Sequence, residues 1–180
     1  MSETPEAYDA LIIGAGVIGA AIAHELAGRG WTTLTVDKAA SAGAGSTINS
    51  CAIVRFSYSS VEGTNLAWEG MHYWKDWPAY IGTVDELGLI DYHMTGQLVF
   101  QPPGEGTHAA RVKALWDEMD IPHETWDAAT IKERLPYLDP GLFGPPTRPD
   151  DDAFWKDAQG AIERGYFAPD AGYVLSLIHI

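Results

Sequence analysis

The sequence predicts an α/β fold that begins with a Rossmann-like βαβ unit, and three consecutive features near its start predict it. Tyr8 to Ile13 is a compact apolar run that stops at a glycine, which is typical of a buried parallel strand. The next stretch carries apolar residues at helical spacing and is closed by Gly28 and Gly30. A second short apolar run, Thr32 to Val36, then predicts the second strand.

The turn between the first strand and the helix has the pattern Gly14-Ala-Gly16-Val-Ile-Gly19. In such a turn the first glycine permits the tight bend, the second lets the backbone approach a pyrophosphate, and the third lets the helix pack closely on the strand. Asp37, at the end of the second strand, is placed to accept hydrogen bonds from a ribose. Together these residues predict a nucleotide-binding unit; the alternative is an α/β turn that binds no ligand.

Composition excludes several other classes of protein. The 180 residues include 11 basic and 25 acidic side chains, and the formal charge of −14 opposes binding to nucleic acids or anionic membranes. One cysteine cannot form a disulfide framework, and the start carries no basic segment of a signal peptide. The six histidines form no cluster with metal-ligand spacing, so no metal site is predicted. We therefore expect a soluble, cytoplasmic protein.

The segment after Asp37 differs from a classical NAD domain, which would continue in regular alternation of helix and strand. Here the small-residue loop AASAGAGSTINSCAIVR follows Lys38, and an aromatic-rich helical segment comes next. With YDALIIGAGVIGAAIAHELAGRG and VDK, this loop resembles the D-amino-acid oxidase and sarcosine oxidase superfamily of FAD-dependent oxidoreductases. Thr95 to Phe100, Ile131 to Pro136 and Gly165 to Val174 also resemble segments of that family.

The resemblance implies FAD as the cofactor and assigns its contacts to the glycine-rich turn and the loop. The implied contacts are Gly14, Gly16 and Gly19 with the pyrophosphate, Asp37 with the adenosine ribose, Lys38 nearby, and Ser46 and Thr47 with the diphosphate or ribityl chain. Asn49 stands where covalently flavinylated relatives carry a histidine, which implies that FAD is held non-covalently through this segment. Ile48 and Ala52 occupy positions that are often glycine in the family.

The resemblance further implies the oxidation of a small amine or amino acid, similar to sarcosine, glycine or a D-amino acid, by hydride transfer to the flavin. It makes Arg55 the candidate catalytic residue, because a guanidinium can bind a substrate carboxylate with two hydrogen bonds and orient the reacting C–H bond. A structural ion pair is the other interpretation of Arg55. Two alternatives for the whole chain are a truncated, non-catalytic nucleotide-binding fragment and an NAD-dependent dehydrogenase.

The remaining sequence predicts elements of a second domain. Thr107 can cap a helix with an apolar face, Ile121 to Trp126 suggests a short edge strand, and Asp127 can cap a brief helix that ends before Pro136. Tyr92 and His93 could face the substrate. The aromatic-rich segment has a stripe that we expect to be core, the alternative being the lining of a flavin pocket: Leu66, Gly70, Tyr73, Trp74, Trp77 and Ile81.

The predicted domains are residues 1–80, the N-terminal part of an FAD-binding domain of the glutathione-reductase type, and residues 81–174, part of a substrate-side α+β domain. The fold is expected to be incomplete, because a doubly wound domain needs further parallel strands. Residues 175–180, with the sequence LSLIHI, are expected to be a non-native tail. The same six residues are encoded by CTG TCT CTT ATA CAC ATC, which resembles a transposon end used in sequencing libraries; a natural truncation is the alternative.

Overall fold

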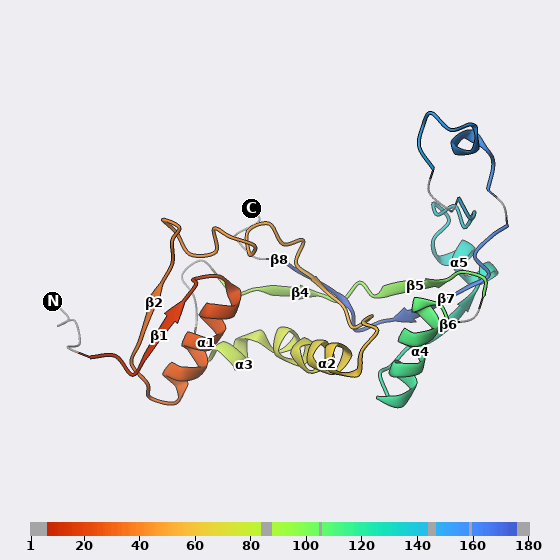
Figure 1. Cartoon of the computed structure of the whole chain (residues 1–180). Coiled ribbons are helices and arrows are strands. Elements are labelled where there is room, and N and C mark those ends of the chain that lie inside the picture. The colour runs from red at the N-terminus through yellow and green to blue at the C-terminus, as the bar shows by residue number, and fades with distance from the viewer. Residues whose placement is uncertain (1–6, 84–87, 105, 144–146, 159, 176–180) are drawn as a thin grey trace. The chain divides into compact units, whose positions relative to one another are not determined.

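The computed structural model describes residues 7–83, 88–104, 106–143, 147–158 and 160–175. Its contacts divide the chain into two compact units (Figure 1). The first unit is drawn from the described residues of 1–53, 77–90 and 175–180, and the second from those of 54–76 and 91–174. The predicted division at residue 80, which concerns ligand-binding domains, stays a prediction. The predicted tail lies outside the described residues apart from Leu175.

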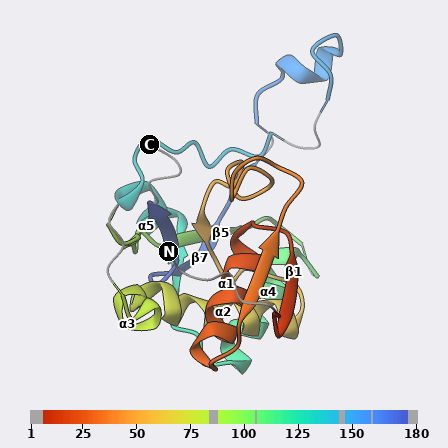
Figure 2. The same cartoon turned by 90° about the vertical axis from the view of Figure 1, so that its left-hand side faces the viewer.

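The first unit contains the predicted βαβ arrangement. Strand β1 (Ala10–Ile13) leads into helix α1 (Val17–Gly28), and strand β2 (Thr33–Val36) follows. The two strands pair in parallel, with Ala10 opposite Thr33 and Ile13 opposite Val36. Helix α1 packs on both strands (Figure 2). Helix α3 (Trp77–Ile81) joins α1 through Tyr80, whose hydroxyl donates to Glu25 Oε1 at 3.0 Å.

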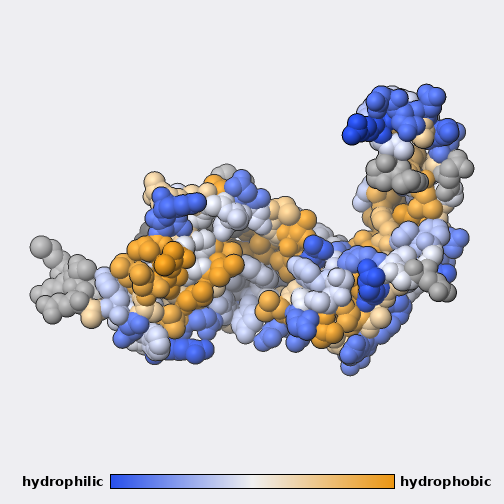
Figure 3. All heavy atoms as spheres, viewed as in Figure 1, coloured by the Kyte–Doolittle hydropathy of each residue, from blue (hydrophilic) through white to orange (hydrophobic). Residues whose placement is uncertain are grey.

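The prediction that the first strand is buried was wrong for one of its faces. Ile12 is 7% exposed and lies under α1, but Leu11 is 60% and Ile13 is 85% exposed. Within the described residues, this sheet has only β1 and β2, so no second layer covers the face opposite the helix. Figure 3 shows apolar side chains gathered at the surface of this unit.

The second unit contains a three-stranded antiparallel sheet, strands of a second sheet, and helices beside them. One three-stranded sheet has the order β5-β7-β6, and β6 is an edge strand as predicted. Another has the order β3-β8-β4. The elements are β3 (Ile53–Val54), α2 (Val61–Lys75), β4 (Asp91–His93), β5 (Gln97–Gln101), α4 (His108–Glu118), β6 (Glu124–Asp127), α5 (Ala128–Arg134), the 3₁₀ helix η1 (Asp152–Trp155), β7 (Arg164–Ala168) and β8 (Gly172–Leu175). The boundary between the units passes through β3 and β8.

Both capping predictions in this unit are confirmed. The Thr107 side chain accepts a hydrogen bond from the Ala110 N–H at the start of α4, and Asp127 accepts one from the Thr130 N–H at the start of α5. Each cap satisfies a backbone donor that the helix leaves free. The apolar face of α4 then delivers Val112 and Trp116 to the core, where both are fully buried.

The prediction for the aromatic stripe was wrong. None of its six residues is buried, and Leu66 is 76% exposed. The buried side chains of α2 are instead Thr64 and Met71, seven residues apart on one helix face. The Ser60 side chain caps this helix by accepting from the Gly63 N–H, so the helix begins earlier than the aromatic spacing suggested. The spacing of large residues did not predict the buried face of this helix, because the cap and the packing determine which face lies against the core.

Candidate functional site

The glycine-rich turn has the close packing that a dinucleotide-binding turn requires. Gly14 has φ +112°, a conformation that side chains other than glycine rarely adopt. A Cβ on Gly19 would lie 1.8 Å from the Gly14 carbonyl oxygen, so only glycine lets α1 approach the turn. A Cβ on Gly16 would lie 3.0 Å from Thr47 Oγ1. The turn therefore presents bare backbone at the N-terminus of α1.

Asp37 holds the same turn from the end of β2. Its Oδ2 accepts from the Ala15 N–H at 2.7 Å, and its Oδ1 accepts from the Ala39 N–H at 2.8 Å. These two hydrogen bonds hold the pKa of the Asp37 carboxyl below its ordinary value of 3.8. The bond from Ala15 has the larger effect, and the bond from Ala39 comes second. The carboxylate is solvent-exposed, and each of its oxygens has a further lone pair for a ribose hydroxyl.

The loop that follows Lys38 returns to the turn. Gly43 donates its N–H to the Ala15 carbonyl at 2.8 Å, and Thr47 Oγ1 accepts from the Val17 N–H at 3.0 Å. Thr47 thus contacts the first residue of α1, where free N–H groups and the helix dipole attract anions. Ser46 and Lys38 are exposed on the same loop. The turn, Asp37 and this loop form one continuous structure that we call the cofactor cradle: residues 14–19, 37–39 and 43–47.

The backbone at Ala52 has a conformation that suits glycine better than alanine. Its φ is +52°, in the left-handed region that carries a steric cost for alanine. The family pattern often has glycine here, and the backbone keeps the glycine-like conformation although the side chain has changed. The other departure, Ile48, does not have positive φ in the described chain.

Arg55 lies in the second unit on a rigid segment. Phe56 is fully buried and its carbonyl accepts from the indole N–H of Trp116 at 2.9 Å. Arg55 Nη1 donates to Ser57 Oγ at 3.1 Å, and the guanidinium lies 5.1 Å from the centre of the Tyr58 ring. In the described part of the chain, no carboxylate pairs with Arg55.

Sequence reasoning missed two residues beside Arg55. Ser57 is 3% exposed, and its Oγ also accepts from Gln97 Nε2 at 2.8 Å. The signal for Gln97 was an amide at the start of the otherwise apolar strand run LVF. Ser57 carried no such signal, because a lone serine between aromatic residues is common.

Tyr92 and His93 have local partners. The Tyr92 hydroxyl donates to the Asp170 carbonyl. Burial of the hydroxyl, and to a smaller extent the charge of Asp170, raises the pKa of Tyr92 to about 12. This phenol therefore stays protonated at neutral pH and is no general base there. His93 stacks on Tyr173 with ring centroids 5.0 Å apart. Asp91 Oδ2 lies 3.2 Å from His93 Nε2, but without hydrogen-bond geometry.

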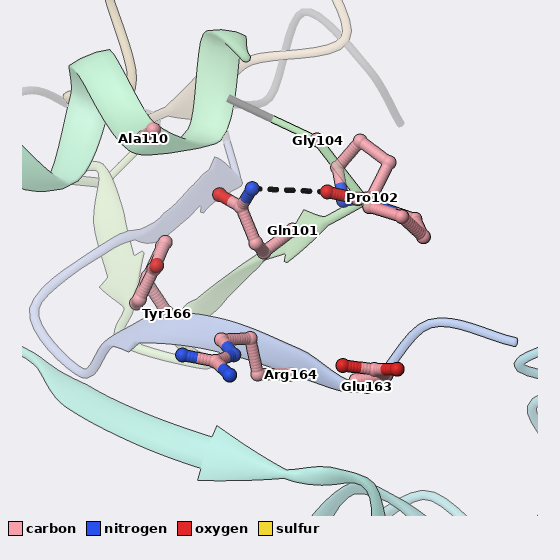
Figure 4. A pocket seen from close by; sticks show the side chains of 8 residues that line it. Gln101, Pro102, Gly104, Ala110, Glu163, Arg164 and Tyr166 are labelled. Atoms are coloured by element: carbon pink, nitrogen blue, oxygen red, sulfur yellow. Dashed lines mark hydrogen bonds between the residues drawn. The ribbon is translucent and has the colours of Figure 1, made fainter. Parts of the chain in front are cut away.

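A cavity of about 260 Å³ lies at the end of β5 where Gln101 stands (Figure 4). The Gln101 side chain lines it and donates from Nε2 to the Pro102 carbonyl at 2.9 Å. Arg164 and Tyr166 of β7 form another wall. None of the predicted site residues lines this cavity.

The sequence matches the family described as FAD dependent oxidoreductase (DAO) over residues 9–174, and the chain belongs to that family. The family binds FAD, which sets aside the NAD-dependent alternative. The cofactor cradle fits such a dinucleotide: it offers bare glycine backbone, a helix N-terminus and a carboxylate. In the described residues, no helix is long and apolar enough to cross a membrane.

Solved structures with the same fold support this assignment. L-proline dehydrogenase from P. horikoshii is 21% identical with a TM-score of 0.70, over 94% of this chain and 38% of that chain. Glycine oxidase from Bacillus cereus is 21% identical with a TM-score of 0.65, over 93% and 40%. L-amino acid deaminase from Proteus vulgaris is 22% identical with a TM-score of 0.62, over 96% and 36%. The chain thus spans about two fifths of these structures. The search of curated proteins gave no match.

Proposed function

We propose that the natural protein containing this chain oxidises a small amine or amino acid with FAD held in the cofactor cradle. Gly14, Gly16 and Gly19 would admit the pyrophosphate, and the free N–H groups of α1 would hydrogen-bond it, with Ser46 and Thr47 beside it. Asp37 would accept from the adenosine ribose, with Lys38 nearby. Bound FAD would supply the acceptor for the hydride of the substrate C–H bond.

The surroundings of Arg55 support the proposal that the substrate has a carboxylate group. Its guanidinium is fixed on the buried Phe56 segment, and no carboxylate in the described residues neutralises it. A planar guanidinium that keeps free donors matches the two oxygens of a carboxylate. The amino acids named for the similar structures are consistent with this proposal: proline and glycine.

The test is anaerobic reduction of the protein-bound flavin, followed by its absorbance. N-methylglycine, glycine, D-alanine and L-proline would be compared with their matched amines, which lack the carboxylate: dimethylamine, methylamine, ethylamine and pyrrolidine. We expect reduction by at least one amino acid and a KM at least about tenfold lower than for its matched amine.

Arg55→Met should remove that preference, raising the KM for the amino acid about 10- to 100-fold and leaving that of the amine unchanged. Arg148→Met, in an exposed loop, is the matched control. Equal use of amino acid and amine by the wild-type protein would contradict the assigned role of Arg55.

A further inference from the structure

Three side chains from two separate segments form a polar chain in the second unit. Arg55 Nη1 donates to Ser57 Oγ at 3.1 Å and lies 3.5 Å from the Ser57 carbonyl oxygen. Gln97 Nε2 donates to the same Oγ at 2.8 Å, although Gln97 is forty residues further along the sequence. Ser57 is therefore the shared partner of a guanidinium and an amide.

The chain of hydrogen bonds is unusual because one end of it is unpaired. Gln97 Oε1 is buried and has no hydrogen-bond partner in the described structure. Leaving a buried acceptor unpaired is costly, and an apolar side chain at this strand position would avoid the cost. A 180° rotation of the amide would exchange its oxygen and nitrogen. The Ser57 hydroxyl would then donate to Oε1, and Nε2 would be the buried group without a partner. The Nε2 bond to Ser57 links two segments of the fold, and the buried Oε1 is the part of the amide that this link does not explain.

The backbone beneath Gln97 is closely fixed. Gly96 has φ +78°, and a Cβ on it would lie 2.2 Å from Phe167 Cζ. Gln97 itself pairs with Ala168 of β7, which is fully buried. The start of β5 thus has little freedom to shift, and the amide has a set direction toward Ser57.

We propose that Gln97 is a positioning residue for Arg55, acting through Ser57, and that it thereby sets the affinity for the substrate carboxylate. This inference rests on the proposed function of Arg55. Ser57 binds Nη1, which leaves the donors of Nε and Nη2 for a ligand. Holding the guanidinium in one orientation before the ligand arrives removes part of the ordering cost of binding.

The experiment uses the natural FAD-loaded protein and Gln97→Leu, which keeps the side-chain bulk and removes the amide. We expect the KM for the amino-acid substrate to rise about tenfold, with the KM for its matched amine unchanged. In an Arg55→Met background the same substitution should have no further effect on KM, because the positioned group is gone. Gln101→Leu, on the same strand but bonded to Thr107 and Pro102, is the matched control.

A second measurement separates this inference from the proposed function. Acetate is titrated into the protein, and the ¹⁵N signal of the Arg55 guanidinium reports binding. About tenfold weaker acetate binding in Gln97→Leu, with wild-type binding in Gln101→Leu, supports the positioning role even if no amino acid reduces the flavin. Failure of flavin reduction alone would contradict the proposed function and not this inference.

Three results would overturn the positioning role. One is a Gln97→Leu effect of equal size on the amino acid and the amine. Another is a Gln97→Leu effect that persists unchanged in the Arg55→Met background, which would indicate general damage to the fold. The last is the absence of any acetate response at Arg55 in the wild-type protein.

Discussion

Asp37 shows how one side chain can serve both the fold and the ligand. Its carboxylate accepts a hydrogen bond from the Ala15 N–H of the glycine-rich turn and another from the Ala39 N–H at the start of the next loop. The sequence predicted a ribose contact for Asp37 from its position after the second strand, but it did not predict these two backbone bonds. They depend on where the loop returns, which the local pattern does not encode.

The lowered pKa of Asp37 makes the stability of the first unit depend on pH. A depressed pKa means that the ionised form stabilises the fold above the ordinary value of 3.8, and that this stability is lost as the pH falls through the lower folded value. The free energies of unfolding of the wild type and Asp37→Asn, measured in urea, should therefore differ at neutral pH and converge as the pH falls below 3.8. Asp150→Asn, in an exposed loop, controls for the loss of one charge. A difference that stays constant down to strongly acidic pH would contradict this assignment.

Ala52 gives a prediction of opposite sign. Because its φ is +52°, Ala52→Gly should relieve steric strain and raise the free energy of unfolding by about 0.5–1 kcal/mol. Ala42→Gly is the control: Ala42 lacks a positive φ, so glycine there should add only flexibility and lower stability slightly. Thermal unfolding of both variants measures the difference, and a destabilised Ala52→Gly would show that the alanine methyl group makes a needed contact.

Among the elements, those with local signals were the predictable ones. The βαβ unit, the Thr107 and Asp127 caps and the edge strand are all present, because apolar period, glycine and capping residues act within a few positions. The burial of α2 was not predictable in this way. Its inner face, with Thr64 and Met71, is chosen by contacts with distant segments, and its largest side chains are not its most buried ones.

The junction of β4 and β8 depends on one glycine. A Cβ on Gly172 would lie 1.9 Å from the His93 carbonyl oxygen, which is backbone and cannot rotate away. Gly172→Ala should lower the free energy of unfolding by about 3 kcal/mol or more. Gly70→Ala is the matched control in helix α2, where a Cβ meets no atom within 4 Å and should stabilise by about 0.5–1 kcal/mol. Chemical denaturation distinguishes them, and a tolerated Gly172→Ala would mean that the two strands can separate.

For the whole molecule, the exposed face of β1 gives a test of whether anything else packs on this sheet. Parallel sheets are ordinarily covered on both faces, yet Ile13 is 85% exposed while its neighbour Ile12 is 7% exposed. In the 180-residue chain, Ile13→Lys should change the free energy of unfolding by less than about 0.5 kcal/mol, whereas Ile12→Lys should prevent folding of the first unit.

The same pair of substitutions can be tested in a longer protein that contains this chain. If further sheet and helix cover this face there, Ile13→Lys becomes about as damaging as Ile12→Lys. The yield of folded, FAD-loaded protein measures this. Tolerance of Ile13→Lys there would mean that the face remains open to water.

The hydrogen bond from Trp116 to the Phe56 carbonyl has a spectroscopic consequence. This indole is fully buried, and Phe56, whose carbonyl accepts its hydrogen bond, is the immediate neighbour of Arg55. A fluorine atom on the Trp116 ring would therefore sense small backbone shifts next to Arg55, the residue proposed to bind the substrate carboxylate. Trp155, which is 75% exposed at the end of η1, would supply the reference resonance in the same spectrum. The core of the second unit thus contains a position from which the proposed binding at Arg55 can be followed by ¹⁹F NMR.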